Sequence, residues 1–344
     1  MDSMRPMKEI DDITRERFER DVVPAYEPVV MRGAVRHWPL VAQGRAGLEP
    51  CLQYLMGFDG GKPVDAVLAK PEPTRAFSYK PDLDGFNFMR DKRPYAALFE
   101  QLWRYSHFPD PPSLAAQSAL VSEALPGLEL ANVLPLLDAA VPPRIWIGNR
   151  ATVPAHFDDS HNIACVAAGR RRFTLLPPAC APLLYLGPPD YAPTPAPMSV
   201  VPDLHRADPA QFPLLAEALE SAVVAELEPG DAIYMPPLWF HQVESLAPHL
   251  NILMNYWWRP LAAPQRPDDL HLAAMRLAML ALRHLPDGER EGWRALFAHY
   301  VFSARGEGLA HIPAGQRHLF GDIDAAADAV VRKDILDRLR GGAE

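Results

Sequence analysis

Short apolar runs separated by turn residues fill the chain from about residue 144 to residue 258. Eight such runs, each five to eight residues long, have the length and the β-branched or aromatic content of strands. Pro229-Gly230-Asp231 is a turn signal between two of them. Strands at this spacing predict a sandwich or barrel. We expect them at residues 144–148, 153–158, 162–168, 172–176, 222–227, 231–235, 241–246 and 251–258.

Helical patterns flank this region on both sides. Before it, residues 9–22 and 95–105 have helical spacing, and residues 28–32 form a further strand candidate. Past Pro267 helices are predicted at residues 268–285, 289–301 and 323–339. We therefore expect a mainly β fold with N-terminal α/β elements. One domain over residues 1–262, with its barrel core at about 140–260, precedes a C-terminal helical extension over residues 263–344.

Composition narrows the functional classes. A net charge of −9 argues against a nucleic-acid-binding protein that works by broad electrostatics, and leaves a basic protein or peptide substrate possible. Three scattered cysteines are too few for a disulfide framework or a zinc site. Residues 1–20 are charged and lack an apolar targeting segment, and no stretch has the length of a membrane span. We expect a soluble cytoplasmic protein that binds neither nucleic acid nor membranes.

Proline is frequent, at 38 residues, and one cluster of prolines lies between two of the predicted strands. This segment, residues 177–219, is long for a connection within a compact domain. Connections of this length are commonly either functional or disordered. We expect it to border the entrance for a substrate.

Candidate chemistry begins with His156-Phe157-Asp158 and the distant His241. Alternation along a strand places the side chains of His156 and Asp158 on one face, and His241 would complete two imidazoles and one carboxylate. That ligand set leaves three coordination positions open and suits non-haem Fe(II). His161 is a competing ligand, but its odd separation from His156 would turn it to the opposite face. A His-x-Asp pair alone is common by chance, so the surrounding residues must decide.

Six ordered motifs surround these residues: 144–148 (RIWIG), 154–158 (PAHFD), 169–178 (GRRRFTLLPP), 227–236 (LEPGDAIYMP), 239–246 (WFHQVESL) and 251–257 (NILMNYW). With them, the region from Pro28 to Arg259 resembles the cupin-like, Jumonji-C-type 2-oxoglutarate oxygenases. In particular, it resembles the group that contains the asparaginyl hydroxylase of hypoxia-inducible factor. The resemblance implies a double-stranded β-helix, or jelly-roll, that holds Fe(II) inside its open end.

The resemblance also implies a reaction and a set of binding residues. Fe(II), the co-substrate 2-oxoglutarate and O2 would hydroxylate a protein side chain or a small molecule. Arg171 would bind the far carboxylate of 2-oxoglutarate, since arginine can hold a carboxylate bidentately. A solvated run of Arg170, Arg171 and Arg172 is the alternative, and parity allows either Arg171 alone or the other two to face inward. Asn162 and Asn255 match positions near the metal and co-substrate, although buried amides can equally serve the backbone.

Two departures from the family pattern weaken the co-substrate site. Val153 stands where the hydroxylase pattern has a threonine, with Thr152 beside it as a candidate donor, and Ala115 stands where the pattern has a tyrosine. Each lost hydrogen bond to a carboxylate would cost about 1.5–3 kcal/mol. The alternative function is therefore a metal-binding cupin-like protein that does not use 2-oxoglutarate. A cupin isomerase, or a dioxygenase without 2-oxoglutarate, is a further alternative.

The first helix after Pro267 is apolar over much of its circumference. Such a helix is expected to be buried on more than one side. In the resembling hydroxylases a C-terminal pair of helices forms the dimer interface. We therefore expect a homodimer, with simple packing of these helices on the barrel as the alternative.

Overall fold

The structure, a computed structural model, describes residues 4–194, 196–259, 270–303, 311–313, 316–317, 319 and 325–341. The chain divides into two compact units, residues 1–268 and 269–344. The predicted domain boundary at residues 262/263 lies outside the described residues, as do the predicted starts of the helices at residues 268 and 323.

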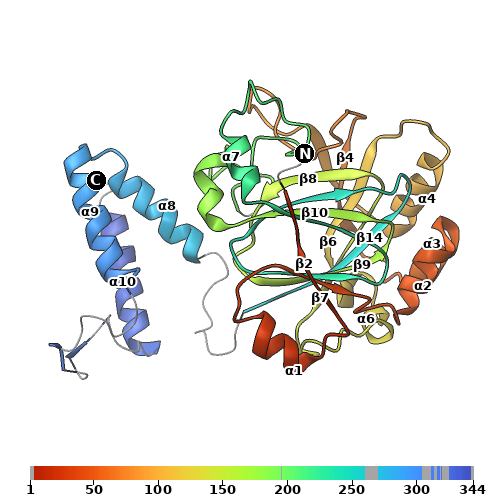
Figure 1. Ribbon diagram of the computed structural model, residues 1–344, viewed down its shortest axis with the longest axis horizontal. Coiled ribbons are helices and arrows are strands. Elements are labelled where there is room, and N and C mark those ends of the chain that lie inside the picture. The colour runs from red at the N-terminus through yellow and green to blue at the C-terminus, as the bar shows by residue number, and fades with distance from the viewer. Residues whose placement is uncertain are drawn as a thin grey trace. The chain divides into compact units, whose positions relative to one another are not determined.

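All eight strands predicted in the central region are present. They are β7 (Pro143–Gly148), β8 (Ala151–His156), β9 (His161–Ala168), β10 (Arg171–Leu176), β11 (Val223–Leu227), β12 (Ala232–Met235), β13 (Phe240–Ser245) and β14 (Asn251–Trp258). Successive strands lie in different sheets, except that β10 and β11 are neighbours in the same sheet. One sheet contains β8, β10, β11 and β13, and it faces the sheet that contains β7, β9, β12 and β14. This arrangement is the double-stranded β-helix of a cupin-like jelly-roll, as predicted (Figure 1).

The inner faces of the two sheets share one apolar cluster. Its members come from both sheets, for example Phe173 and Leu175 from β10 and Ala164 and Val166 from β9. Because side chains alternate along each strand, the neighbouring residues of the same strands point outward. Alternation therefore determines which side chains of each strand point into the barrel, where a ligand would be bound.

Further strands extend both sheets beyond the jelly-roll. The nine-stranded sheet adds β2 (Lys8–Asp11), β3 (Val29–Arg32), β4 (Val64–Ala69), β5 (Phe88–Arg93) and β6 (Ser113–Leu120). The five-stranded sheet adds β1 (Arg5–Pro6). Only β3 was predicted among these strands. The alanine-rich β6 lacks the β-branched residues that mark a strand, and its pairing with β4 and β7 determines its conformation.

Helices cover the outer face of the nine-stranded sheet (Figure 1). They are α2 (Pro39–Ala46), α3 (Leu48–Met56) and the predicted α4 (Tyr95–Tyr105), with short α5 (Val121–Ala124) and α6 (Leu128–Ala131) nearby. Their buried residues pack with outward-facing strand residues such as Ile145 and Met254 in the largest apolar cluster. The nine-stranded sheet is thus apolar on both faces.

The predicted helix at residues 9–22 is only partly present. Its first residues form strand β2, and the helical part comprises α1 (Arg15–Arg17) and a π-helical turn, Phe18–Val22. Residues 5–11, the N-terminal crossover segment, run from one sheet to the other: β1 pairs in parallel with β11, and β2 with β3. Met7, between these strands, is buried in the inner cluster. Pairing with both sheets therefore overrides the helical pattern.

The proline-rich segment packs on the outer face of the five-stranded sheet. It contains a 3₁₀ helix, Pro178–Leu183, and helix α7 (Leu215–Glu220). Leu184, Val201 and Leu204 from this segment join Leu176 and Phe240 of the sheet in one apolar cluster. Each of the two sheets thus has a cover on its outer face, and the covers come from different parts of the chain.

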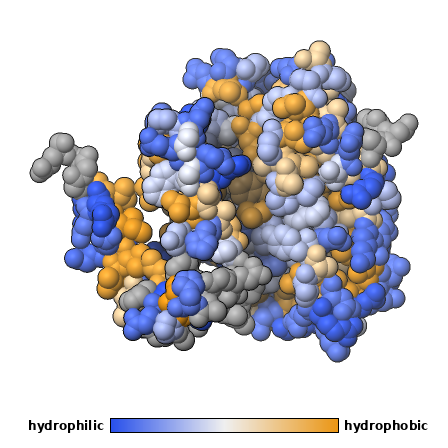
Figure 2. Space-filling view, turned by 60° about the vertical axis from the view of Figure 1, so that its left-hand side comes forward, coloured by the Kyte–Doolittle hydropathy of each residue, from blue (hydrophilic) through white to orange (hydrophobic). Residues whose placement is uncertain are grey.

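The second unit contains α8 (Leu270–Leu282), α9 (Asp287–Tyr300) and α10 (Ala325–Gly341). Large apolar side chains on these helices are exposed, including Leu280, Trp293 and Leu339. The smaller body in Figure 2 shows such side chains in orange on its surface. Homodimerisation through these helices stays a prediction. No helix among the described residues is long and apolar enough to cross a membrane.

Candidate metal centre

Two strands bring the candidate metal ligands together at one end of the barrel. His156 is the last residue of β8 and pairs directly with His241, the second residue of β13. Asp158 follows β8 by two residues. Ligand atoms of the three side chains lie within 4.8 Å of one another. The predicted His156–Asp158–His241 set is thus assembled, and we call this end of the barrel the triad end.

A β-bulge in β8 determines which residues share the face of His156. His241 pairs with His156 and Val243 with Val153, so three steps along β8 match two along β13. The extra residue, at Pro154–Ala155, shifts the alternation by one position. Val153 and His156 therefore both face the interior, although they are an odd number of residues apart.

In both histidines Nδ1 contacts a backbone carbonyl oxygen, which leaves Nε2 pointing to the interior. Nδ1 of His156 lies 2.9 Å from the carbonyl oxygen of Pro154, and Nδ1 of His241 lies 3.1 Å from that of Trp239. A carbonyl oxygen only accepts hydrogen bonds, so Nδ1 carries the proton in both rings and Nε2 keeps its lone pair. Nε2 of His241 lies 3.7 Å from Oδ2 of Asp158. Both imidazoles are thus in the tautomer that a metal requires.

Burial makes His156 a neutral ligand at physiological pH. Desolvation, reinforced by the nearby His241, lowers the pKa of His156 to about 4, although Asp158 opposes the shift. The ring centroids of the two histidines are 4.3 Å apart. Protons therefore compete weakly for this nitrogen near neutral pH.

The carboxylate of Asp158 is held by two hydrogen bonds from the interior. Nδ2 of Asn162 donates to Oδ2 of Asp158 at 3.1 Å, and Nε1 of Trp257 donates to the same oxygen at 3.0 Å. Asn255 in turn donates to Asn162 at 3.3 Å and accepts from Nε1 of Trp146 at 3.0 Å. Asn162 and Asn255, both predicted near the metal, thus form a chain that orients the carboxylate.

The hydrogen bond from Trp257 to Asp158 was not predicted from the sequence. The sequence contained a usable signal, because Trp257 follows Asn255 by two residues on one strand and so shares its face. Trp146 was missed in the same way. Tryptophan is easily assigned to packing because most of its surface is apolar.

Arg171 lies inside the barrel at the end opposite the triad. It is the first residue of β10, on the same face as Phe173 and Leu175, and pairs with Ser245 of β13. The side chain is buried, and its Nε has no hydrogen-bond partner. Burial lowers the pKa of the guanidinium to about 10. Within the described part of the chain, no carboxylate pairs with this buried cation.

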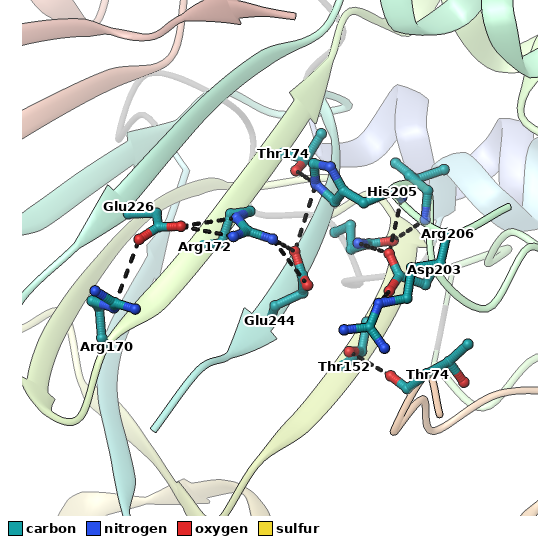
Figure 3. A network of polar contacts seen from close by, with 12 residues as sticks. Thr74, Thr152, Arg170, Arg172, Thr174, Asp203, His205, Arg206, Glu226 and Glu244 are labelled. Carbon is teal, nitrogen blue, oxygen red and sulfur yellow. Dashed lines mark hydrogen bonds and ion pairs between the residues drawn. The ribbon is translucent and has the colours of Figure 1, made fainter. Parts of the chain in front are cut away.

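The two neighbouring arginines point away from the barrel interior, into a polar network on the outer face of the same sheet (Figure 3). Arg172 contacts Glu226 at 2.8 Å and Glu244 at 3.3 Å, and Arg170 lies 3.6 Å from Glu226. The parity question is therefore answered: of the three arginines, Arg171 alone faces inward.

A model of the cupin-like domain matches residues 15–263. The chain belongs to the cupin-like domain family. Among its relatives, Jumonji C domain-containing protein 5 of Drosophila melanogaster is 26% identical over 73% of this chain, which spans 59% of the relative. The bifunctional peptidase and (3S)-lysyl hydroxylase JMJD7 of Homo sapiens is 25% identical over 70% of this chain and 80% of its own length. The tRNA wybutosine-synthesizing protein 5 of Gallus gallus is 24% identical over 74% and 77%.

The predicted Jumonji-C-type resemblance is thereby confirmed at the level of the family. The finer likeness to the asparaginyl hydroxylase of hypoxia-inducible factor stays a prediction. The names of the relatives describe different substrates, a lysyl residue in one case and a tRNA base in another. Membership of the cupin-like family therefore leaves the substrate of this chain open.

Thr152 does not reach the interior of this cupin-like barrel, contrary to the prediction that it helps to bind the co-substrate. Its hydroxyl donates to the carbonyl oxygen of Thr74 at 2.9 Å on the outer face (Figure 3). In an unbroken strand Thr152, four residues before His156, would share its face. The bulge at Pro154–Ala155 places Val153 there instead.

The second departure from the family pattern, Ala115, lies opposite Gly148 and packs against an apolar group that includes Ala151. Sequence reasoning missed Ser245, the register partner of both Ala151 and Arg171. Ser245 alternates with His241 and Val243, so its hydroxyl is on the inner face beside Arg171. A hydroxyl donor is thus present near Arg171, but it comes from a different strand than the resemblance implies.

His161 is not a ligand of this group. Its Nδ1 lies 2.8 Å from the hydroxyl of Tyr234, and its ring stacks on Trp258 with centroids 5.2 Å apart. The expectation that His161 faces away is correct, but the reason differs. A turn separates it from β8, and it begins β9 in the other sheet.

The proline-rich segment reaches the triad end of the cupin-like barrel. Met198 forms an antiparallel bridge with His156, and the backbone N–H of Ser199 donates to Ala155 at 2.7 Å. A second bridge joins Leu186 to Ser199. Part of the segment is therefore bonded to the strand that carries the first metal ligand.

Proposed function

We propose that this chain is an Fe(II)- and 2-oxoglutarate-dependent oxygenase that hydroxylates a protein side chain or a small molecule. One observation carries the proposal: the buried guanidinium of Arg171, whose Nε has no partner among the described residues, lies on the same interior face as an open triad of His156, Asp158 and His241. A triad alone would suit many metal-binding proteins. The unpaired cation adds the requirement for an anion inside the barrel.

The donor set fits Fe(II). Two neutral imidazoles and one carboxylate can occupy one side of the ion and leave positions for other ligands. When bound, the iron would activate O2, which is the oxidant: one oxygen atom would enter succinate as 2-oxoglutarate is oxidised with loss of CO2, and the other would enter the hydroxylated substrate. The chain's own residues fix the ligands. Asn162 and Trp257 hold the carboxylate of Asp158, and the backbone holds both imidazole rings in the tautomer that binds metal.

The spacing of Arg171 and the triad suits a short dicarboxylate. His241 pairs with Leu175 and Ser245 with Arg171, so the two positions are four residues apart along β10. That separation is about 13 Å at the usual rise per residue. The arginine side chain, a five-carbon dicarboxylate and a metal ion in line can fill this span. Arg171 would then bind the far carboxylate bidentately, and the hydroxyl of Ser245 would donate a further hydrogen bond.

The alternative, a metal-binding cupin-like protein that does not use 2-oxoglutarate, rests on Val153 and Ala115. Neither side chain can donate to a carboxylate. Ser245 weakens this objection, because it places a hydroxyl opposite Arg171. A protein without an anionic co-substrate would also have no use for a buried unpaired cation, which destabilises the fold.

Anaerobic addition of Fe(II) and 2-oxoglutarate to the apoprotein tests the proposal. We expect a visible metal-to-ligand charge-transfer band in the wild type. Arg171→Gln should raise the 2-oxoglutarate concentration needed for half the band by about 30-fold or more, because a charge-assisted pair is lost. Arg170→Gln, one residue away on the outer face, is the matched control and should leave it unchanged.

Iron binding without the band in the wild type would favour the alternative function. Equal effects of the Arg171 and Arg170 substitutions would remove Arg171 from the site. Iron content, measured on each variant after gel filtration, separates loss of co-substrate from loss of metal.

The bridge between Met198 and His156 supports a role for the proline-rich segment at the substrate entrance. Deleting residues 190–202 should change which substrates are used more than it changes iron binding. Equal loss of both would contradict this role.

Homodimerisation through the C-terminal helices remains part of the proposal, and their exposed apolar residues support it. Sedimentation of the full chain measures the mass of the assembly.

A further inference from the structure

We propose that Arg144 binds a carboxylate of the substrate and so selects substrates with an acidic group close to the oxidised position. This inference rests on the proposed function and deepens it. Arg144 is the second residue of β7 and pairs directly with Asn255 of β14. It lies two residues from Trp146, on the inner face and at the triad end of the barrel.

The guanidinium of Arg144 is fixed in place by uncharged groups. One nitrogen, Nη1, donates to the carbonyl oxygen of Ser118 at 2.8 Å. The guanidinium carbon lies 5.9 Å from the ring centroid of Trp257, in a cation–π arrangement. Neither contact neutralises the charge. The residues that the structure describes supply no carboxylate within ion-pair distance of Arg144, and the side chain is partly exposed.

The backbone that holds Arg144 is itself unusual. Ala116 pairs with Ile147 and Ala119 with Ile145, so Gln117 and Ser118 form a β-bulge opposite Trp146. Ser118 has a left-handed backbone conformation, with φ of 46°. A non-glycine residue in this region is strained, and such strain persists where the surrounding structure fixes it, often at functional sites. Here the strained residue turns its carbonyl oxygen toward Arg144.

One indole ring links this cation to the metal ligands. Trp257 contacts the guanidinium of Arg144 and, through Nε1, donates to Oδ2 of Asp158. A substrate anion paired with Arg144 would therefore lie beside the triad. Arginine binds carboxylates through two parallel hydrogen bonds, which restricts orientation as well as position. Arg171 is already committed to the co-substrate at the opposite end, so the two arginines would hold two different anions.

The test uses the full chain loaded with Mn(II) and 2-oxoglutarate, with equilibrium binding followed by tryptophan fluorescence. The probes are N-acetyl amides of aspartate, glutamate, asparagine, glutamine and lysine. We expect the acidic probes to bind at least about fivefold more tightly than their amide isosteres. Arg144→Gln should remove this difference, and Arg144→Glu should reverse it in favour of the lysine probe.

Reversal of charge preference distinguishes binding from a structural role, because a substitution that merely loosens Trp257 would weaken all probes alike. Arg90→Gln, at an exposed arginine paired with Asp65, controls for the overall change in charge and should keep the acidic preference. An acidic preference that survives in Arg144→Gln, or no measurable preference in the wild type, overturns the proposal. Absence of the charge-transfer band would overturn the oxygenase instead, since probe binding requires no turnover.

Discussion

Two adjacent arginines on opposite faces of strand β10 differ in whether they form ion pairs. Arg172, on the outer face, contacts two carboxylates, those of Glu226 and Glu244. Arg171, on the inner face, is more deeply buried and contacts no carboxylate of the part of the chain that the structure describes. A fold that pairs one guanidinium so fully can evidently pair cations on this strand. The inner cation therefore indicates a ligand, whereas the outer cation is part of the structure.

Two histidines, His241 on β13 and His205 in the proline-rich segment, repeat the contrast. His241 on the inner face of β13 presents Nε2 to the triad. On the outer face His205 contacts Thr174 at 2.7 Å and Glu244 at 3.5 Å (Figure 3). Both rings are buried, yet one nitrogen faces other potential metal ligands and the other is already bonded. Burial of a polar group alone thus does not identify a site, and the presence or absence of protein partners does.

The largest difference between the faces should appear in metal binding. His241→Ala removes one of three ligands and should weaken Fe(II) or Mn(II) binding by more than about 100-fold, since even loss of an outer partner of a metal ligand costs 10–100-fold. His205→Ala, on the outer face, should leave affinity within about threefold. Metal titration of the two apoproteins measures both values. Similar losses of metal affinity in the two variants would contradict the difference between the inner and outer faces.

Apoprotein stability should change in opposite directions at Arg171 and Arg172. Burial lowers the pKa of Arg171 to about 10, well below the usual value of an arginine, so keeping it charged in the fold costs roughly 3 kcal/mol. Arg171→Met should therefore stabilise the apoprotein by up to about that amount, while abolishing stabilisation by 2-oxoglutarate. Arg172→Met should destabilise it by about 1–3 kcal/mol, because Glu244 loses its cation. Urea unfolding gives both signs, and a loss of stability in both variants would contradict the contrast.

Acid should destabilise the apoprotein partly through the inner histidine. The pKa of His156 is about 4 in the folded chain against 6.5 for an ordinary histidine. The unfolded chain therefore binds the proton first, so this contribution to stability is present above pH 6.5 and is lost as the pH falls toward 4. The expected loss is roughly 1.5 kcal/mol between pH 6.5 and pH 5. His156→Gln should flatten the pH dependence by that amount in urea unfolding, and an unchanged slope would argue against a buried neutral His156.

The smallest expected effect is on 2-oxoglutarate affinity, and it should differ between the neighbouring residues Val153 and Thr152 of β8. Val153→Thr places a hydroxyl on the inner face and should improve 2-oxoglutarate affinity about fivefold, the value of one neutral hydrogen bond. Thr152→Val, on the outer face, should leave that affinity unchanged and cost about 1 kcal/mol of stability through the lost bond to Thr74. Titration of the charge-transfer band compares the two. Improved affinity in neither variant would place the co-substrate away from Val153.

Patterns local to one strand or turn were predictable from the sequence. The eight jelly-roll strands were found because turn residues separate them, and the triad was found because alternation places His156 and Asp158 together. For the arginine run, alternation left either Arg171 alone or the pair Arg170 and Arg172 facing inward, and the resemblance to the oxygenase family selected Arg171.

Features that depend on pairing with distant segments were not predictable. The bulge at Pro154–Ala155 reverses the faces of Thr152 and Val153, and it exists only because β13 pairs with β8 in that register. Ser245 becomes a neighbour of Arg171 because β13 pairs with β10, although the two residues are 74 positions apart in the sequence, and no local pattern predicts such a contact. Strand β2 was mistaken for a helix because its partner β3, and not its own residues, determines its conformation.

The crossover segment at the N-terminus constrains the order in which the barrel can assemble. Arg5 pairs with Val223, more than 200 positions further along the chain. During synthesis Arg5 must therefore stay unpaired until β11 has emerged, after four of the eight jelly-roll strands. Met7 can enter the apolar interior only then. The crossover segment is thus synthesised well before the strand that completes its pairing.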